Sequence, residues 1–286
     1  MKYGTLIHLA AGGDMRENAM KAFQRVLNCG LNACQIVYKP KEFVLEDADV
    51  LRACAEECGI EISAFFCGYR DGCNVWDNRF DFQLQGINSP LFGGERIQYI
   101  ISSIPFVKRL GVTDLITHAG FIPNNPFTDD YARMLAAVRI IALRCKSAGL
   151  NFLFETGGET PVAMLRLIQD VGLDNVFINF DTANLILYGN GNPVDALYTF
   201  GQYVRNTHMK DGLPPTDPVK LGKQVEIGQG YAHFEQLIPK LHELGYNRYM
   251  IIEREIADDR SEEEIMKSIV YLKSIVEKVY GEDADK

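Results

Sequence analysis

A regular alternation of short apolar runs and longer amphipathic segments constrains the fold of this chain more than any other feature. The apolar runs have strand length and are rich in Ile, Val, Phe or Tyr; they occupy residues 4–9, 33–38, 61–66, 114–118, 151–155, 176–181, 203–208 and 248–253. Helical spacing is seen between them at 48–58, 96–110, 130–148, 161–171 and 233–244, and in a last segment that opens at 261. Several of these segments end at a glycine, the residue that most easily leaves a helix in the left-handed conformation.

This alternation predicts an α/β fold, a single (β/α)₈ TIM barrel. Parallel neighbouring strands need a crossover connection, which the intervening helices supply. The length of 286 residues suits such a barrel, which typically takes about 250 residues. No linker or shift in composition divides the chain, so we expect one domain over residues 1–286. A doubly wound sheet fits less well, because Ala11-Gly12-Gly13 after the first run lacks the third glycine of the dinucleotide-binding fingerprint.

Charge and cysteine content exclude several classes of protein. The chain has 29 basic and 38 acidic residues, a formal charge of −9, and its basic residues are scattered, which argues against nucleic-acid binding. Its 7 cysteines include no Cys-x-x-Cys pair, so a structural zinc site is not expected. No run of about 18 apolar residues would span a membrane. The first residues do not resemble a signal peptide, so we expect a cytoplasmic protein with reduced thiols.

Three connections are longer than a barrel requires. They cover residues 67–94, which include the only tryptophan, Trp76, and residues 120–128 and 212–230. Each follows the carboxyl end of a strand, and barrels of this type keep their chemistry on that face. Long loops gathered on one face favour a substrate lid.

The residues that terminate four consecutive strands carry the strongest functional signal. Strands five to eight end in Glu155, Asp181, His208 and Glu253. In a closed parallel barrel these ends converge on one small volume. Three carboxylates and one imidazole suit Mn²⁺, Mg²⁺ or Co²⁺ better than a thiolate-bound metal. Without a cation, burying three carboxylates together would be strongly unfavourable. The sequence therefore predicts a divalent-metal site.

The segments around these residues resemble a known superfamily. They are Phe-Glu-Thr-Gly-Gly-Glu-Thr-Pro at 154–161, Asn-Phe-Asp-Thr-Ala-Asn at 179–184, His-Met-Lys-Asp at 208–211 and Glu-Arg-Glu at 253–255. They resemble the xylose isomerase-like barrels, and within them the sugar phosphate isomerase/epimerase group, relatives of tagatose 3-epimerase and inosose dehydratase. The segments 117–123 and 228–246 are similar to that group as well.

The resemblance implies a function and a mechanism. One divalent cation would be held by Glu155, Asp181, His208 and Glu253; we favour Mn²⁺, with Mg²⁺, Co²⁺ or Zn²⁺ as alternatives. Glu155 and Glu253 would also be the catalytic pair, one removing a proton beside a carbonyl and the other returning it through a metal-stabilised enediolate. The chain would then be a metal-dependent sugar isomerase or epimerase. Which glutamate is the base stays open.

Three departures weaken the assignment to epimerases of free ketoses. Asn184 stands where those enzymes usually have a histidine, and the segment 212–216 lacks their arginine. Pro161 replaces a substrate-binding glutamate, with Glu159 two residues earlier. A lyase or dehydratase on the same scaffold is the alternative, with the same proton abstraction followed by loss of a β-leaving group. The DNA-cleaving branch of the superfamily is disfavoured by the acidic charge and by only 5 histidines.

Five residues are candidates for substrate binding. His118 ends the fourth strand and would bind a sugar oxygen or assist proton transfer. Lys210 points to the same side as His208 and either holds a substrate carboxylate, neutralises the enediolate, or pairs with Asp211 or Glu253. Asn184 would hydrogen-bond a sugar hydroxyl or a metal-bound water. His8, at the end of the first strand, and Trp76, which would stack on a sugar face, complete the set. We expect a small-molecule sugar or sugar derivative as partner and leave a homo-oligomer open.

Overall fold

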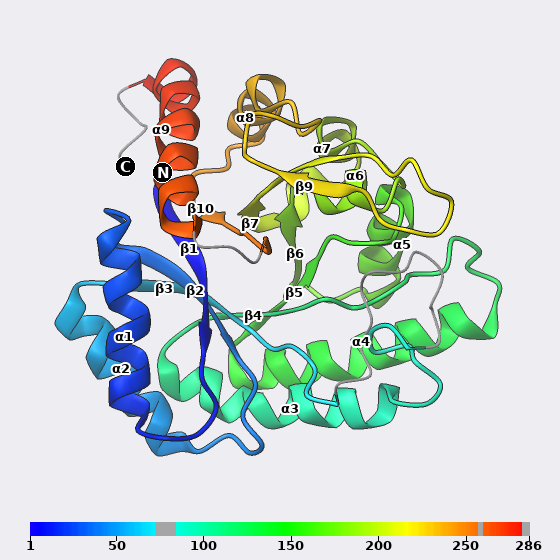
Figure 1. The fold of residues 1–286 in the computed structure, drawn as a ribbon. Coiled ribbons are helices and arrows are strands. Elements are labelled where there is room, and N and C mark those ends of the chain that lie inside the picture. Colours follow the sequence, from blue (N-terminus) through cyan, green and yellow to red (C-terminus); the bar gives the residue numbers. More distant parts are fainter. Residues whose placement is uncertain (72–83, 257–259, 282–286) are drawn as a thin grey trace.

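The computed structural model describes residues 1–71, 84–256 and 260–281. Parallel strands close a barrel in the order β1-β10-β7-β6-β5-β4-β3-β2, shown in Figure 1. These strands are β1 (Lys2–Leu9), β2 (Ala33–Tyr38), β3 (Glu61–Phe66), β4 (Asp114–Thr117), β5 (Asn151–Glu155), β6 (Val176–Asp181), β7 (Val204–Met209) and β10 (Tyr249–Ile252). The prediction of a (β/α)₈ barrel is confirmed.

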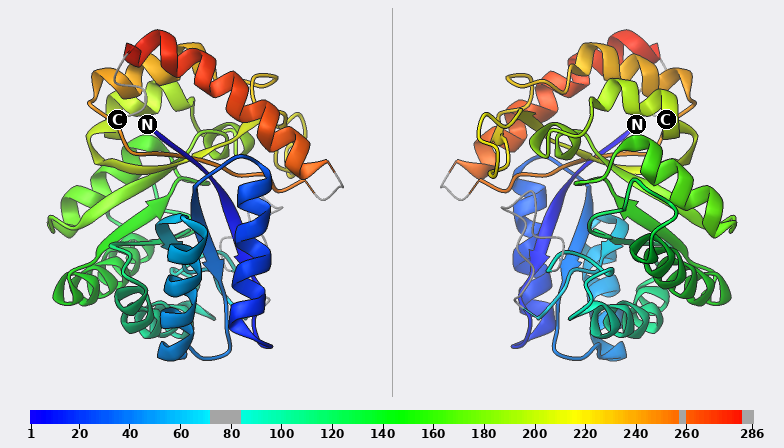
Figure 2. Two further views of the ribbon diagram at one scale, coloured as in Figure 1. Left: turned by 90° about the vertical axis from the view of Figure 1, so that its left-hand side faces the viewer. Right: turned by 90° about the vertical axis from the view of Figure 1, so that its right-hand side faces the viewer.

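Helices surround the barrel, as the two side views of Figure 2 show. They are α1 (Met15–Asn28), α2 (Leu45–Cys58), α3 (Gly93–Leu110), α4 (Asp129–Ala148), α5 (Pro161–Val171), α6 (Asn184–Leu187), α7 (Pro193–Phe200), α8 (Phe234–Glu243) and α9 (Ser261–Tyr280). The sequence pattern did not identify α1, α6 or α7. Within the described ranges, no helix is both long enough and apolar enough to cross a bilayer.

Local signals at the helix ends explain why the chain turns where it does. The side chains of Asp14, Thr128 and Thr160 accept hydrogen bonds from backbone N–H groups in the first turns of α1, α4 and α5. At the other ends, Gly111 and Gly149 adopt φ values of 87° and 80°. In that region a residue with a Cβ is strained, so glycine ends the helix and returns the chain to the next strand.

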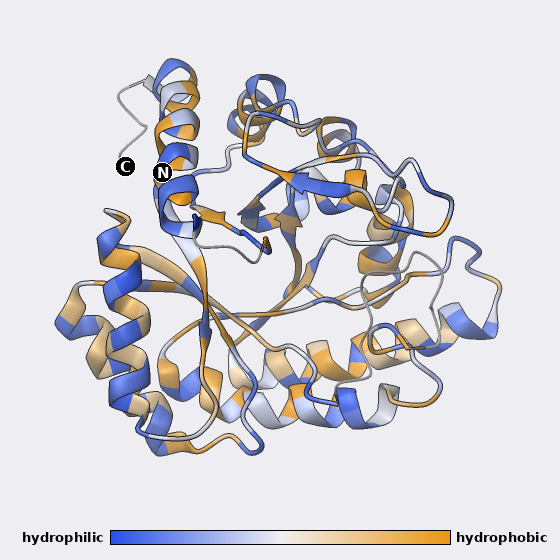
Figure 3. Ribbon diagram, in the orientation of Figure 1, coloured by the Kyte–Doolittle hydropathy of each residue, from blue (hydrophilic) through white to orange (hydrophobic). Residues whose placement is uncertain are grey.

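Apolar side chains fill two layers. The larger layer lies between the barrel and the helices, and Figure 3 shows the apolar strands enclosed by helices with hydrophilic outer faces. A smaller layer fills the barrel itself, with Leu6, Ala33 and Ile251 on one side and Ala64, Ile116 and Leu153 on the other. Burial of these residues fixes which face of each strand points inward.

The long connection after β7 is partly ordered as an antiparallel hairpin. Its strands are β8 (Asp211–Leu213) and β9 (Lys223–Val225). Asp211 is 1% exposed, and its carboxylate accepts backbone N–H bonds from Gly212, Gly228, Gly230 and Ala232. One buried carboxylate therefore organises the return of this connection toward α8.

Candidate metal centre

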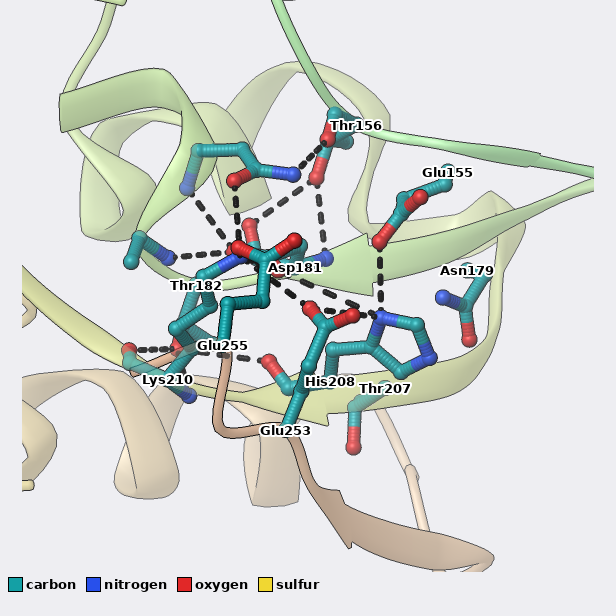
Figure 4. A network of polar contacts seen from close by, with 12 residues as sticks. Glu155, Thr156, Asn179, Asp181, Thr182, Thr207, His208, Lys210, Glu253 and Glu255 are labelled. Carbon is teal, nitrogen blue, oxygen red and sulfur yellow. Dashed lines mark hydrogen bonds and ion pairs between the residues drawn. The ribbon is translucent and has the colours of Figure 1, made fainter. Parts of the chain in front are cut away.

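The four strand-end residues meet at the carboxyl end of the barrel. One side-chain oxygen or nitrogen of each of Glu155, Asp181, His208 and Glu253 lies within 4.8 Å of the others, and all four residues are buried. The Nδ1 atom of His208 lies 2.7 Å from Oε1 of Glu155, 3.3 Å from Oε2 of Glu253 and 4.0 Å from Oδ2 of Asp181 (Figure 4). Strand pairing produces this convergence, because Asp181 on β6 is the register partner of His208 on β7.

The turn after β6 orients the Asp181 carboxylate. Its Oδ1 atom accepts the backbone N–H groups of Ala183 and Asn184, each at 2.8 Å. Its Oδ2 atom is buried and has no hydrogen-bond partner in the described part of the chain, although it lies 3.4 Å from the ammonium of Lys210. A buried carboxylate oxygen with unused lone pairs, pointing at three other ligand atoms, is what a cation site requires.

The charge balance also fits a divalent cation. The three carboxylates of Glu155, Asp181 and Glu253 face the buried ammonium of Lys210. Burial lowers the pKa of His208, but without a metal the charges of the two glutamates raise it well above its usual value. Once His208 gives up its proton to bind a cation, two negative charges are in excess. Burial raises the pKa of Asp181 well above its usual range. Burial and the charge of Glu253 raise the pKa of Glu155. One divalent cation would neutralise the excess, so the residues present fit such an ion.

Glu253 differs from Glu155 in its surroundings. Burial raises the pKa of Glu253, but the charges of Lys210 and His208 outweigh burial and hold that pKa well below its usual range. Its backbone is fixed by Gln224 of β9, whose amide donates to the Glu253 carbonyl at 3.1 Å and accepts from the Glu255 N–H at 3.0 Å. The hairpin after β7 thus holds the end of β10.

Lys210 lies behind the candidate metal centre, and its ammonium forms ion pairs and a hydrogen bond with other side chains of the protein. The residue is 1% exposed, and its Nζ atom lies 3.1 Å from Glu253 and 3.2 Å from Oδ1 of Asn184, and contacts Glu255. The structure favours the expected ion pair with Glu253 over a pair with Asp211, whose carboxylate is taken up by the backbone N–H groups described above. A substrate carboxylate would have to displace these contacts.

A cavity of about 360 Å³ opens over the centre. Its wall includes the two glutamates Glu155 and Glu253 and three of the predicted substrate contacts, His8, His118 and Asn184. Trp76 lies outside the described residues. The sequence reasoning missed Lys39, Tyr69, Tyr188 and Glu255, which also line the cavity. Lys39 directly follows β2, so the strand-end criterion would have found it, whereas Tyr69 lies three residues beyond the end of β3.

A second cavity of about 360 Å³ lies beside β1, between α1 and α9. It shares Leu6 and His8 with the first, but its wall contains none of the four residues of the candidate metal centre. The chemistry is therefore expected in the cavity above the centre.

His118 is held as a neutral hydrogen-bonding group. Its Nδ1 atom accepts the backbone N–H of Gly120 at 3.2 Å, which assigns the ring proton to Nε2. Burial, followed by the positive charge of Lys210, lowers the pKa of His118 to about 3. A neutral ring at physiological pH favours the expected role in binding an oxygen over the expected role in proton transfer.

The side-chain amide of Asn184 already makes two hydrogen bonds within the protein. Its Nδ2 donates to the Thr156 carbonyl at 2.9 Å, and its Oδ1 accepts from Lys210 at 3.2 Å. The amide retains one further donor hydrogen and one further acceptor site. It lines the cavity, so a single bond to a sugar hydroxyl stays compatible with this geometry.

Comparisons with known proteins place this geometry in context. A family model described as a xylose isomerase-like TIM barrel matches residues 23–275. The crystal structure of a xylose isomerase domain protein from Planctomyces limnophilus superposes with a TM-score of 0.86 at 24% identity, covering 98% of this chain and 99% of the other. The 3-keto-D-glucoside 4-epimerase of E. coli gives a TM-score of 0.69 at 16% identity, covering 96% and 99%.

A curated relative adds a second kind of enzyme. Inosose dehydratase of Lacticaseibacillus casei is 26% identical over 164 residues, which are 50% of this chain and 54% of the relative. The alignments span 31% to 54% of the length of the curated relatives that the chain matches. The structural likenesses establish the fold, and the family match covers most of the chain.

Proposed function

The chain belongs to the xylose isomerase-like TIM barrel family, and from this premise we propose that it is a divalent-metal-dependent sugar isomerase or epimerase. The observation that supports this most is the convergence of Glu155, Asp181, His208 and Glu253 beneath a cavity lined by both glutamates. A volume of about 360 Å³ lies in the range of small-molecule sites. The substrate we propose is a sugar or sugar derivative with a carbonyl group.

Glu155, Asp181, His208 and Glu253 would hold the cation, for which we favour Mn²⁺. A bound divalent cation supplies Lewis-acid stabilisation of the negative charge that develops on substrate oxygens. Glu155 and Glu253 transfer the proton: one carboxylate removes it from the carbon beside the carbonyl, and the other delivers one to the product.

Lys210 and His118 support this transfer. Lys210 keeps Glu253 ionised through the ion pair at 3.1 Å. His118 donates its Nε2 hydrogen to a substrate oxygen from the cavity wall. Both act without changing their own charge.

The test is proton exchange with solvent. The Mn²⁺-loaded protein is incubated in D₂O with a panel of ketoses and keto-sugars, and products are followed by NMR. We expect deuterium at the carbon next to the carbonyl together with an isomer or epimer of equal mass apart from the label. Glu155→Gln and Glu253→Gln should each abolish the exchange, whereas the exposed Glu46→Gln should leave it unchanged. Exchange at the wild-type rate in either active-site variant would contradict the proposal.

A lyase or dehydratase is the second candidate, favoured by the similarity to inosose dehydratase over half of this chain and by Asn184 in place of the histidine of ketose epimerases. Elimination uses the same proton abstraction but releases water or another β-leaving group. In the D₂O experiment, a new unsaturated or dicarbonyl product with a released group would identify this chemistry.

A further inference from the structure

Two amide side chains lie inside the barrel where apolar residues are the rule. Gln35 on β2 and Asn179 on β6 are both 0% exposed. The register partners of Gln35 are Leu6 on β1 and Ala64 on β3, which belong to the apolar filling of the barrel. Burying amides in such surroundings is unfavourable unless their hydrogen bonds are made. Packing alone therefore does not explain the presence of two amides at these positions.

Gln35 contacts the side of His208 that faces away from the carboxylates. Its Oε1 atom lies 2.6 Å from Nε2 of His208. An amide oxygen only accepts, so Nε2 carries the ring hydrogen in this contact. The other nitrogen, Nδ1, faces Glu155, Asp181 and Glu253. Hydrogen bonding at Nε2 keeps a hydrogen on that nitrogen, so Nδ1 is the nitrogen that would exchange its hydrogen for a cation.

Asn179 determines which way the Gln35 amide points. Gln35 Nε2 donates to Oδ1 of Asn179 at 3.4 Å. Turning the Gln35 amide over would place its NH₂ against the Nε2 hydrogen of His208 and its oxygen against Oδ1 of Asn179. Asn179 sits on β6 beside β7, which carries His208 (Figure 4).

The arrangement is unfavourable for the barrel alone. Within the described residues, Nδ2 of Asn179 is buried without a hydrogen-bond partner, which lowers stability. The ring of Phe66 stacks against that of His208, with 6.1 Å between the ring centroids and an interplanar angle of 24°. This stacking limits rotation of the imidazole. An imidazole held in one plane, with one nitrogen bound to an amide oxygen, has a single orientation toward the centre.

We propose that Gln35, oriented by Asn179, is a positioning residue that fixes His208 in the tautomer with Nδ1 as the cation ligand. The inference rests on the divalent-cation site of the proposed function. It does not depend on which reaction the site catalyses.

Mn²⁺ affinity provides the first test, measured from the electron paramagnetic resonance signal of free Mn²⁺ without substrate. Gln35→Met keeps the length of the side chain and removes the acceptor, and we expect the Kd to rise about 10- to 100-fold. Gln35→Glu restores an acceptor oxygen and should return the Kd toward the wild-type value. Gln24→Met, on the exposed face of α1, is the matched control and should not change it.

The tautomer itself provides the second test. In protein labelled with ¹⁵N-histidine and loaded with Mg²⁺ or Zn²⁺, the His208 shifts should show a protonated Nε2 and a coordinated Nδ1. Gln35→Met should replace this signature with a mixture of tautomers. In the metal-free protein, adding Asn179→Leu to Gln35→Met should leave the urea midpoint equal to or higher than that of Gln35→Met alone, because the amide that has lost its partner is gone.

Three results would overturn the proposal. One is a wild-type Kd and an unchanged ¹⁵N signature in Gln35→Met. Another is an equal loss of affinity in Gln35→Met and Gln35→Glu with both variants destabilised, which would show a merely structural role. The third is a metal-bound Nε2 in wild type. A protein that binds Mn²⁺ as expected but shows neither isomerase nor lyase activity would instead refute the proposed reaction and leave this inference standing.

Discussion

The ammonium of Lys210 lies 3.1 Å from Oε2 of Glu253 and 3.4 Å from Oδ2 of Asp181, and the lysine is 1% exposed. The positive charge of the lysine thus lies behind two residues of the candidate metal centre and balances part of their negative charge. The opposing carboxylates raise the pKa of Lys210 well above its usual value, even though burial lowers it. The lysine therefore carries its positive charge at neutral pH.

Lys210→Met should destabilise the metal-free protein by about 3–5 kcal/mol, because it leaves buried carboxylates without their partner. Mn²⁺ should recover part of this loss by supplying the missing positive charge. Urea unfolding with and without Mn²⁺ measures both effects. Lys267→Met, which breaks the exposed pair with Glu263 at 2.6 Å, is the control and should change stability by about 0.2–1 kcal/mol. Equal losses in the two variants would contradict the role given to Lys210.

Metal removal should lower stability in a way that depends on Asp181. At a free Mn²⁺ concentration of 100 times the Kd, the free energy of unfolding should rise by about 2.7 kcal/mol, and EDTA should reverse the gain. In Asp181→Asn the two backbone N–H groups retain Oδ1, so the amide NH₂ replaces Oδ2 and presents donors to the cation. Thermal unfolding should show no Mn²⁺ shift in this variant and a normal shift in the surface variant Asp195→Asn. A persistent shift in Asp181→Asn would remove Asp181 from the site.

Stability should depend on pH through Glu159, which is 1% exposed. Burial raises its pKa from 4.5 to about 7. The folded state therefore binds this proton more tightly than the unfolded state. Protonation of Glu159 therefore stabilises the folded state fully below pH 4.5, and this stabilisation is lost as pH rises to about 7. The free energy of unfolding should fall by about 3 kcal/mol over that range.

Glu159→Gln should remove this dependence and make the variant relatively more stable above pH 7. The amide oxygen can still accept the Gly157 N–H that Glu159 accepts at 2.8 Å. Urea unfolding between pH 4 and 8 measures the difference from wild type, and Glu46→Gln on the exposed first turn of α2 is the control. Parallel pH profiles for wild type and Glu159→Gln would contradict the raised pKa.

The position of His118 should depend on the absence of a side chain at Gly157. A Cβ atom at Gly157 would lie 2.2 Å from Nε2 of His118, so Gly157→Ala forces the imidazole out of place. We expect a loss of about 1–3 kcal/mol in stability and a higher KM for the substrate. Gly94→Ala has open space around its Cβ and should stabilise α3 by about 0.5–1 kcal/mol. An unchanged KM in Gly157→Ala would argue against contact between His118 and substrate.

Local periodicity was sufficient to predict the strands of the barrel, because a strand buried against helices needs a continuous apolar run whatever its distant neighbours are. The ends of β5, β6, β7 and β10 pointed to Glu155, Asp181, His208 and Glu253, since parallel strands in a closed barrel bring their carboxyl ends to one place. The same criterion, applied to β2, would have found Lys39.

What the sequence could not reveal depends on barrel closure and side-chain direction. Gln35 and His208 are 173 positions apart and meet at 2.6 Å, a contact set by register across the barrel rather than by any local pattern. The partner of Lys210 and the nitrogen that His208 turns toward the carboxylates follow from that geometry as well. Sequence alone therefore determined which four residues gather at the candidate metal centre, because strand ends are local features. Only the tertiary structure decided how each side chain is turned, because hydrogen bonds between distant strands fix those directions.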